Sequence, residues 1–402
     1  MNLFVIPSWY PSADNKLAGL FIKEQTLVLA DKHQINIGIS CWGQNDNDYL
    51  LWSGDHLKNI PKLLNASGKK FKRIKLRDNC VEYHTSAFTW TRKILNGNIN
   101  KIVKSNKENL NHFRNEFGNI DVIIAHMGYP GGYIANQLSA EFGIPYVIIE
   151  NMSPFPFDIF ITPHKTLVKP LIRAYQGASL NIAVSNHQKF SMQRFGIKNL
   201  DILPNFIRDE AFYPDAKKRS GDYIKLLFIG RLEHQKGVDV LLQSMKLLDL
   251  KNNKMSLTIV GNGSLEKQLK SLTDSLEISE HIHWMGLKLE DDIPEIIRAH
   301  DIFILPSRHE SFGIVCLEAM ASGLPCVVTK CGGPEDIITN EVGILVDKEN
   351  PKMLSQAIQK LADTLPVFEK EKIRNYYEEH FSSKKITQQL IQSCNSIRDK
   401  TI

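Results

Sequence analysis

The stretch FILPSRHESFGIVCLEAMASGLPCVVTKCGGPED, residues 303–336, carries the pattern that decides how the fold is interpreted. It opens on an apolar run, passes through a short polar loop and continues as a long, mostly apolar segment. Glu310 and Glu318 are its only acids before Glu335, and they stand eight positions apart around a glycine. Two carboxylates at this spacing, in so apolar a stretch, indicate a binding function.

The local pattern predicts a strand over Asp301–Ser307, a loop over Arg308–Gly313, and a helix from Ile314 to about Ser322. The first N–H groups of a helix have no partner within it, and the helix dipole favours negative charge there. Gly313 has no side chain that would block a ligand from reaching these groups. We therefore expect an anion, such as a diphosphate, at the start of this helix.

The two glutamates lie on either side of the predicted anion site. Glu310 precedes the helix, and Glu318 lies roughly 6–8 Å along it at ~1.5 Å per residue. Carboxylates are poor partners for phosphate but good acceptors for sugar hydroxyl groups. The order sugar, diphosphate, ribose fits this spacing, whereas capping or solvated acids are the alternative interpretation.

A second loop offers cations for the same anion. The predicted strand Lys225–Ile229 is followed by GRLEHQKG, residues 230–237, and then by an amphipathic helical pattern. Arg231 and Lys236 stand directly after the strand, where the flanking glycines allow close approach of a ligand. A phosphate-binding loop is the favoured interpretation, and a loop with two solvated charges is the alternative.

Strand and helix patterns alternate along the whole chain, interrupted by a polar, turn-rich stretch over Pro204–Tyr223. This predicts two doubly wound α/β units with parallel sheets, joined by a linker and facing across a cleft. The expected domains are 1–205, 206–383 and a C-terminal helix over 384–402. The predicted strands are Leu3–Ile6, Ile35–Ser40, Val81–Thr85, Asp121–Ala125, Tyr146–Ile149, Asn181–Val184, Ile202–Leu203, Lys225–Ile229, Ser256–Val260, His281–Trp284, Ile302–Leu305, Cys326–Thr329 and Ile344–Val346.

The composition is that of a globular protein, with 43% hydrophobic and 23% charged residues among 402. The N-terminus MNLFVIPSWYP has no basic lead and is not expected to be a secretory signal. No stretch reaches the ~18 apolar residues of a membrane-spanning helix. The six cysteines show no CxxC pairing, which favours reduced, buried thiols in a cytoplasm.

Positive charge is concentrated in Lys58–Arg77, which holds eight basic residues and no acid. A solvated basic loop is one interpretation. An anionic partner, such as a lipid surface or a phosphate-bearing acceptor, is another. Nucleic acid is the least favoured, since no motif for reading bases accompanies the charge.

Several of these motifs resemble one known family. GRLEHQKG and HESFGIVCLEAMASGLP are similar to the signatures of the retaining glycosyltransferases of family 4, glycosyl transferases group 1, which have the GT-B fold. The segments AHMGYPGGYIA, IVGNGSL and GGPEDII are similar to further motifs of that family. The likeness is strong from Ile182 to Asp347 and diffuse before it.

The resemblance implies a role for each matching residue. Arg231 and Lys236 would neutralise the diphosphate, Glu318 would bind the ribose, and Glu310 would bind the transferred sugar. His126, at the end of a strand in the first domain, would face that sugar. Many members carry a glycine pair after the first strand, where this chain has only Gly19. The implied catalytic residues are Glu310, His126, Arg231 and Lys236. The implied donor-binding residues are Gly19, Arg231, Lys236, Gly286, Leu287, Glu310, Ser311, Phe312, Gly313, Ile314, Val315 and Glu318.

The implied reaction moves a hexose or N-acetylhexosamine, with retention, from a nucleoside diphosphate sugar to a saccharide or lipid-linked glycan acceptor. A UDP-sugar is the favoured donor and surface polysaccharide synthesis the favoured context. The acceptor is expected on the first domain, with the C-terminal helix packed back on it. No metal, cofactor or nucleic acid is expected. The expected location is the cytoplasm, with peripheral contact to an anionic membrane.

Other functions remain open on the sequence alone. A metal-dependent transferase needs a D-x-D motif, and Asp46-Asn47-Asp48 matches it within a polar loop where a chance match is the better interpretation. A sugar-nucleotide epimerase would form product from donor alone, and a phosphorylase would consume inorganic phosphate. A catalytically silent sugar-nucleotide sensor would bind the donor and leave it intact.

Overall fold

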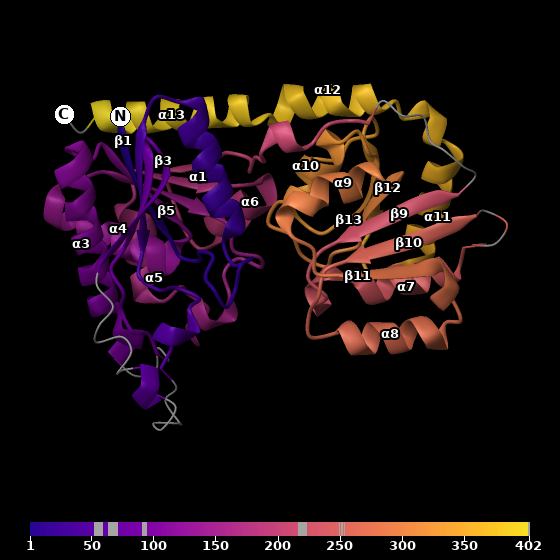
Figure 1. Ribbon diagram of the computed structural model, residues 1–402, viewed down its shortest axis with the longest axis horizontal. Helices are drawn as coiled ribbons and strands as arrows, with labels where there is room; N and C mark the ends of the chain where they lie inside the picture. Colours follow the sequence, from indigo (N-terminus) through magenta and orange to yellow (C-terminus); the bar gives the residue numbers. More distant parts are fainter. Residues whose placement is uncertain are drawn as a thin grey trace. The chain divides into compact units, whose positions relative to one another are not determined.

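The chain folds into two compact units, each built on a parallel sheet (Figure 1). The computed structural model describes residues 1–51, 59–62, 71–90, 95–215, 223–248, 250, 252 and 254–400. Unit 1 comprises Met1–Val184, Lys189–Leu203 and Ile386–Ile402, and unit 2 comprises Ser185–Gln188 and Pro204–Lys385. Each unit is described by itself below.

The sheet of unit 1 has the strand order β3-β4-β2-β1-β5-β6-β7-β8 within the described residues. Every neighbouring pair is parallel except β3 and β4. The order grows outward from β1 in both directions, so the topological switch point lies between β1 and β5. The strands are β1 (Asn2–Pro7), β2 (Asn36–Cys41), β3 (Lys72–Arg77), β4 (Cys80–His84), β5 (Val122–His126), β6 (Tyr146–Glu150), β7 (Leu180–Ala183) and β8 (Leu200–Ile202).

Helices cover both faces of this sheet. On one face lie α3 (Ile99–Phe117), α4 (Tyr133–Phe142) and α5 (Lys169–Gly177), which bury a continuous hydrophobic core. On the other lies α1 (Leu20–Lys32), and the part of α13 (Ser383–Asp399) that belongs to unit 1 runs along the end of the sheet where β1 begins (Figure 1). The two-sided cover explains why β5 and β6 are buried along their whole length. The helix α6 (Asn186–Arg194) begins in unit 2 and continues in unit 1.

The sheet of unit 2 has the order β11-β10-β9-β12-β13-β14, parallel throughout the described residues. This is the 3-2-1-4-5-6 order of dinucleotide-binding sheets, and its switch point lies between β9 and β12. The strands are β9 (Ile224–Ile229), β10 (Met255–Val260), β11 (Ile282–Gly286), β12 (Ile302–Leu305), β13 (Cys326–Lys330) and β14 (Gly343–Asp347). The helices α7 (Val238–Lys246), α8 (Glu266–Ser275) and α11 (Pro351–Asp363) pack on one face, and α9 (Ile293–Arg298), α10 (Ile314–Ala321) and α12 (Lys370–Phe381) on the other.

Every predicted strand is present, with ends that shift by at most two residues, and the predicted fold class is confirmed. The basic segment differs from its interpretation as a loop, because Lys72–Arg77 forms β3. Its sequence KRIKLR alternates cations with apolar residues, as suits an edge strand with one solvated face. Arg73 pairs with Glu116, and Arg77 with Asp31, so acids of unit 1 already compensate part of the charge. Lys58, Lys69 and Lys70 lie outside the described residues.

The predicted linker over Pro204–Tyr223 is wrong in its first half, which packs onto unit 2. The Asp209 carboxylate accepts hydrogen bonds from the Tyr377 hydroxyl and the Ser383 amide, and Phe212 is buried. Residues 216–222 lie outside the described part of the chain. None of the described helices is both long and apolar enough to cross a membrane. All six cysteines are buried and free.

Candidate functional site

Two loops meet at the switch point of unit 2, one after β9 (residues 230–237) and one after β12 (residues 306–313). Gly237 has a φ of +65°, and a Cβ atom there would lie 2.1 Å from the backbone oxygen of Pro306. Only glycine permits so close an approach of the two backbones. The glycine that ends GRLEHQKG therefore sets the distance between the two loops.

A buried arginine ties the two loops together. The Arg308 guanidinium donates two hydrogen bonds to the Asp239 carboxylate, at 2.9 and 2.8 Å, and one to Glu349 at 2.6 Å. It also donates to the backbone oxygen of His234 at 2.7 Å. These carboxylates raise the pKa of Arg308 above its usual value. The sequence analysis missed Arg308 and Asp239, because no local pattern links charges 69 positions apart.

This framework brings two predicted site residues into contact. The Lys236 Nζ atom lies 2.6 Å from Glu310 Oε1, and the Ser307 hydroxyl donates to the same oxygen at 2.7 Å. The Lys236 and Glu310 side chains are only 16% and 10% exposed. The backbone of Glu310 is held on both sides, by Cys331 O and Gly333 N. Lys236 and Glu310 therefore form an ion pair. The sequence analysis assigned Lys236 to the diphosphate and Glu310 to the sugar, and it did not predict contact between the two side chains.

The start of α10 is open, as the sequence predicts. Gly313 precedes it with a φ of +100°, and no side chain caps the helix. Ile314 and Val315 are partly exposed, whereas Phe312 is 2% exposed and packs against Phe381 with ring centroids 6.3 Å apart. Phe312 therefore anchors the loop through its side chain, and only its backbone is placed to meet a ligand. The Ser311 carbonyl accepts a hydrogen bond from Ser185 at 2.7 Å.

The remaining predicted residues of unit 2 surround these loops. Arg231 is exposed, and its guanidinium has no hydrogen-bond or ion-pair partner among the described residues. Glu318 lies one turn into α10, partly buried, and burial together with the charge of Glu290 raises its pKa to about 8. Gly286 ends β11 with a φ of +65°, and the adjacent Leu287 is 50% exposed. An exposed apolar side chain there suits contact with a flat ring.

His126 ends β5 at the switch point of unit 1. Its side chain is 4% exposed, and burial lowers its pKa to about 4, so the imidazole is neutral at pH 7. Its Nδ1 atom has no hydrogen-bond partner among the described residues. The Ser8 hydroxyl donates to the His126 carbonyl at 2.7 Å and accepts from Gly131 N at 2.9 Å, which fixes the turn.

A buried carboxylate behind His126 was missed by the sequence analysis. Glu150 accepts hydrogen bonds from the amides of Gly128, Asn151 and Met152, and from the Tyr175 hydroxyl. Burial raises the pKa of Glu150 despite these donors. The apolar strand in front of it, YVIIE, gave the only signal, since an acid that ends a fully buried strand needs hydrogen-bond donors.

Gly19 precedes α1 with a φ of +68°, and a Cβ atom there would lie 2.2 Å from the Trp9 carbonyl oxygen. The β1–α1 loop itself therefore requires a glycine at this position. A contact of Gly19 with a donor remains a prediction.

Comparison with known proteins finds a family match in unit 2. Residues 209–379 match the model of the family described as glycosyl transferases group 1. The matched segment contains both loops of the site and most of unit 2. The predicted resemblance to group 1 glycosyltransferases is confirmed.

Two relatives of the chain are informative. An uncharacterised glycosyltransferase from Methanocaldococcus jannaschii is 29% identical over 60% of this chain and 65% of its own length. The amylovoran biosynthesis glycosyltransferase AmsK from Erwinia amylovora is 24% identical over 67% of this chain and 69% of its own length. The chain thus spans slightly less than two thirds of the archaeal relative.

Two solved structures share the GT-B fold over nearly the whole chain. Sucrose-phosphate synthase from Thermosynechococcus elongatus gives a TM-score of 0.76 at 17% identity, and 99% of each chain is covered. HepE from Anabaena, solved in complex with UDP-glucose, gives a TM-score of 0.67 at 16% identity over 98% of this chain and 100% of its own. These likenesses establish the fold of the chain.

Proposed function

We propose that the protein is a glycosyltransferase that moves a hexose or N-acetylhexosamine from a nucleoside diphosphate sugar to a saccharide or lipid-linked glycan acceptor. One observation carries this proposal: Lys236, Glu310 and the uncapped start of α10 converge at the switch point of unit 2. Cation, carboxylate and free backbone amides are the groups that a sugar diphosphate needs. The group 1 family match supports the same reaction class.

A UDP-sugar is the proposed donor. HepE, which shares the fold, was solved with UDP-glucose. In this chain the exposed Leu287 and the left-handed backbone at Gly286 would meet the base, and Glu318 the ribose hydroxyls. AmsK acts in amylovoran biosynthesis, which supports a role for this chain in polysaccharide assembly.

The proposed chemistry keeps the configuration of the sugar. The bond between the anomeric carbon and the diphosphate oxygen breaks, and negative charge develops on the leaving phosphate. Arg231, Lys236 and the start of α10 stabilise this charge, which removes the need for a metal ion. The acceptor oxygen attacks from the side on which the diphosphate leaves, and its proton passes to a phosphate oxygen. Glu310 positions the sugar, and neutral His126 offers it one further hydrogen bond.

The proposed function is tested by incubating the full chain with UDP-glucose, UDP-N-acetylglucosamine and other sugar nucleotides and following thermal shift and donor turnover. Binding of a nucleoside diphosphate sugar raises the unfolding temperature. Transfer to an added glycan supports the proposal. Product formed from donor alone would point to an epimerase, dependence on inorganic phosphate to a phosphorylase, and tight binding without turnover to a sensor.

The raised pKa of Glu318 predicts that donor affinity depends on pH. The free protein holds the Glu318 carboxyl protonated below its pKa of about 8, whereas ribose hydroxyls donate best to the ionised form. Binding of UDP-glucose must therefore release a proton below that pH, and its affinity should rise about tenfold between pH 6.5 and 8.5. Calorimetric titration measures this rise, and Glu318→Gln should abolish it. An equal rise in the variant would contradict contact between Glu318 and the ribose.

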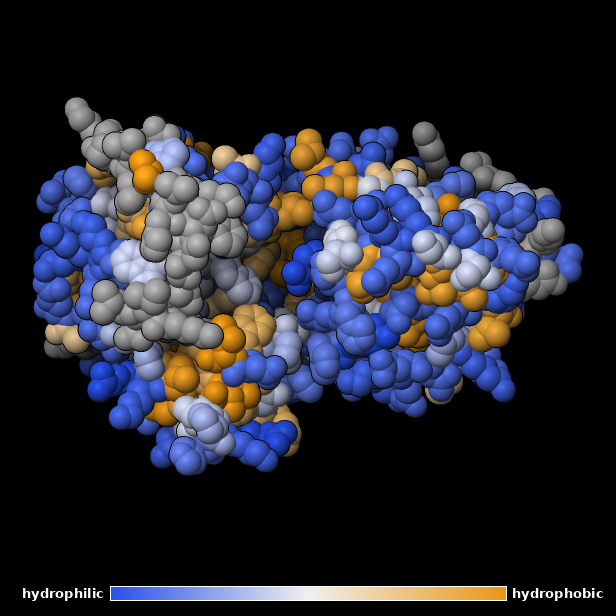
Figure 2. Space-filling view, turned by 90° about the horizontal axis from the view of Figure 1, so that it is seen from below, coloured by the Kyte–Doolittle hydropathy of each residue, from blue (hydrophilic) through white to orange (hydrophobic). Residues whose placement is uncertain are grey.

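Peripheral contact with an anionic membrane is proposed for unit 1. Figure 2 shows hydrophobic residues on its surface, and the exposed fractions of Ile159 and Phe190 are 68% and 62%. Lys165 and Lys169 lie near Ile159 in the sequence, so apolar and cationic groups occur together. The protein should sediment with vesicles that contain phosphatidylglycerol at low salt and dissociate at high salt. Protein that ignores such vesicles at low salt would refute this contact.

A further inference from the structure

Unit 1 contains a pocket of about 590 Å³ on the β2–β4 side of its sheet. The pocket lies at the carboxyl ends of β2 and β4, under the loop that follows β1 and beside the start of β3. Its volume lies within the range of small-molecule sites. None of the residues implied by the family motifs lines it.

A buried carboxylate organises one wall of this pocket. Glu82 is 3% exposed, and its Oε1 atom accepts from the Tyr10 hydroxyl at 2.7 Å and from Lys23 Nζ at 3.0 Å. Its Oε2 atom lies 2.9 Å from His84 Nε2. Burial alone would raise the pKa of Glu82, but the hydrogen bonds from His84 and Tyr10 and the charge of Lys23 lower it to about 2. Glu82 is therefore an ionised carboxylate that only accepts hydrogen bonds.

The ionised state of Glu82 fixes what its neighbours offer to a ligand. His84 Nε2 must carry the proton in its bond to Glu82, so the Nδ1 atom remains as the second polar group of the imidazole. Tyr10 donates its proton to Glu82 and keeps its oxygen lone pairs as acceptors. Both Tyr10 and His84 line the pocket, where Glu82 holds each in one orientation.

The other walls combine aromatic and polar groups. Phe71 lines the pocket, is 40% exposed and stacks on His112 with ring centroids 3.7 Å apart, so its ring is held in place. Ser86 adds a hydroxyl group, and Asp46 and Lys72 add one charge of each sign, whereas the Ser12 hydroxyl and the Gln44 amide already bond to the protein backbone. A sugar presents an apolar ring face and a rim of hydroxyls that both donate and accept. The ring of Phe71, the acceptor atoms of Tyr10 and His84 and the hydroxyl of Ser86 match that surface.

We propose that this pocket of unit 1 binds a saccharide unit of the acceptor, with Tyr10 and His84, held by Glu82, as hydrogen-bonding partners of its hydroxyl groups. The assignment of the sugar as an acceptor rests on the proposed transferase function, whereas sugar binding itself rests on the pocket alone. The loop after β1 contributes both Tyr10 and the predicted donor contact Gly19.

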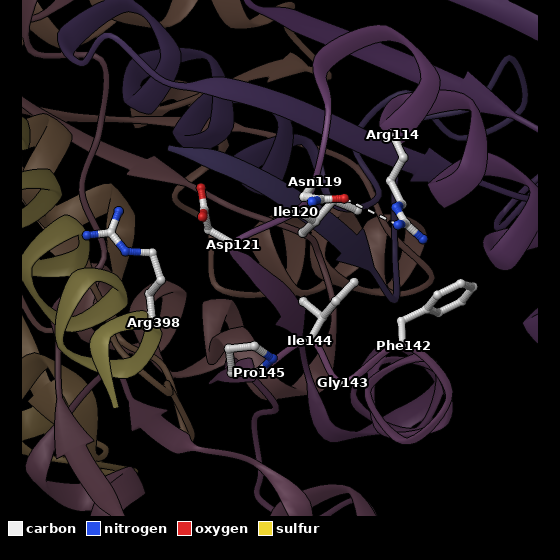
Figure 3. A pocket seen from close by; sticks show the side chains of 9 residues that line it. All are labelled: Arg114, Asn119, Ile120, Asp121, Phe142, Gly143, Ile144, Pro145 and Arg398. Atoms are coloured by element: carbon white, nitrogen blue, oxygen red, sulfur yellow. Dashed lines mark hydrogen bonds between the residues drawn. The ribbon is translucent and has the colours of Figure 1, made fainter. Parts of the chain in front are cut away.

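A second pocket in unit 1, of about 350 Å³, is less suited to a ligand (Figure 3). It lies at the opposite edge of the sheet, before β5 and β6. Its cations are already engaged: Arg114 donates to Asn119 at 3.2 Å, and Arg398 pairs with Asp399 at 2.9 Å. The pocket shown in Figure 3 therefore carries no proposal.

The test measures binding of free sugars to the full chain by saturation-transfer NMR. The probes are glucose, galactose, N-acetylglucosamine and glucuronic acid at millimolar concentration, with UDP binding followed in parallel. Tyr10→Phe removes one hydroxyl and leaves the ring, and Ile74→Trp places bulk on a residue that lines the pocket. Lys75→Trp is the matched control, since successive side chains of β3 point to opposite faces and Lys75 does not line the pocket.

At least one of the free sugars should bind the wild-type chain. Tyr10→Phe should weaken that binding about tenfold, and Ile74→Trp should abolish it. Lys75→Trp should have no effect, and UDP affinity should stay unchanged in all three variants. The proposal is overturned if no probe binds, or if Ile74→Trp binds the sugar as the wild type does. If the wild-type chain does not bind UDP, the transferase function is contradicted. The sugar titration still tests whether the pocket binds a saccharide.

Discussion

Replacing Glu310 with alanine is expected to lower the rate of sugar transfer by about a hundredfold or more, while the protein stays folded. Glu310 accepts hydrogen bonds from Lys236 and Ser307, and its backbone is fixed by Cys331 and Gly333. A carboxylate held in this way positions sugar hydroxyls without reorganising. Its loss should reduce kcat, measured by release of nucleoside diphosphate in the presence of an acceptor.

The matched variant Glu310→Gln keeps the size of the side chain and one acceptor oxygen. It should retain more activity than the alanine variant, because the Ser307 hydroxyl still has a partner. Affinity for UDP itself should change little in both variants, since Glu310 is assigned to the sugar. Near-normal turnover by Glu310→Ala, in protein with an unchanged melting temperature, would refute the role of Glu310.

Replacing Lys236 with methionine is expected to reduce transfer by about a hundredfold to a thousandfold. The substitution keeps the apolar stem and removes the ammonium that would face the leaving phosphate. Because charge grows on that phosphate as the sugar departs, the lost interaction costs more in the transition state than in the bound donor. Unlike the Glu310 variants, Lys236→Met should also weaken UDP binding, as measured by calorimetry.

Lys246→Met is the control for Lys236, since it removes an exposed ammonium of α7 that pairs with the surface acid Glu277. Surface pairs of this kind contribute little to stability. Arg231→Met should act in the same direction as Lys236→Met, because its exposed guanidinium is assigned to the same diphosphate. If the wild type and Lys236→Met bind UDP with equal affinity, the assignment of the Lys236 ammonium to the diphosphate site is contradicted.

Much of the site is predictable from local sequence because it is built from strand ends. Lys236 follows β9 and Glu310 follows β12, and each stands beside glycines that mark a turn. Parallel strands bring their carboxyl ends to one edge, so residues 74 positions apart share one site. The position of Gly313 likewise predicted that α10 begins at Ile314 with free backbone amides.

Other features of the structure could not be predicted from local sequence patterns. The strand β3 was missed because the density of cations over Lys58–Arg77 favoured a solvated loop, and its pairing with β4 became visible only in the structure. The bond between Arg308 and Asp239 and the network around Glu82 join distant loops, and single residues of these networks give no signal in the sequence. The predicted linker was polar, yet Asp209 fixes its first half to unit 2.

The sequence by itself determined the two doubly wound sheets, the two loops of the candidate site and the resemblance to group 1 glycosyltransferases, since periodicity, glycine positions and short motifs are local properties of the chain. Only the tertiary structure decided that Lys236 meets Glu310, that Glu318 and His126 sit where burial shifts their pKa values, and that Glu82 organises a pocket in unit 1. Charge, burial and hydrogen bonding depend on which residues become neighbours in space, and packing sets those neighbours.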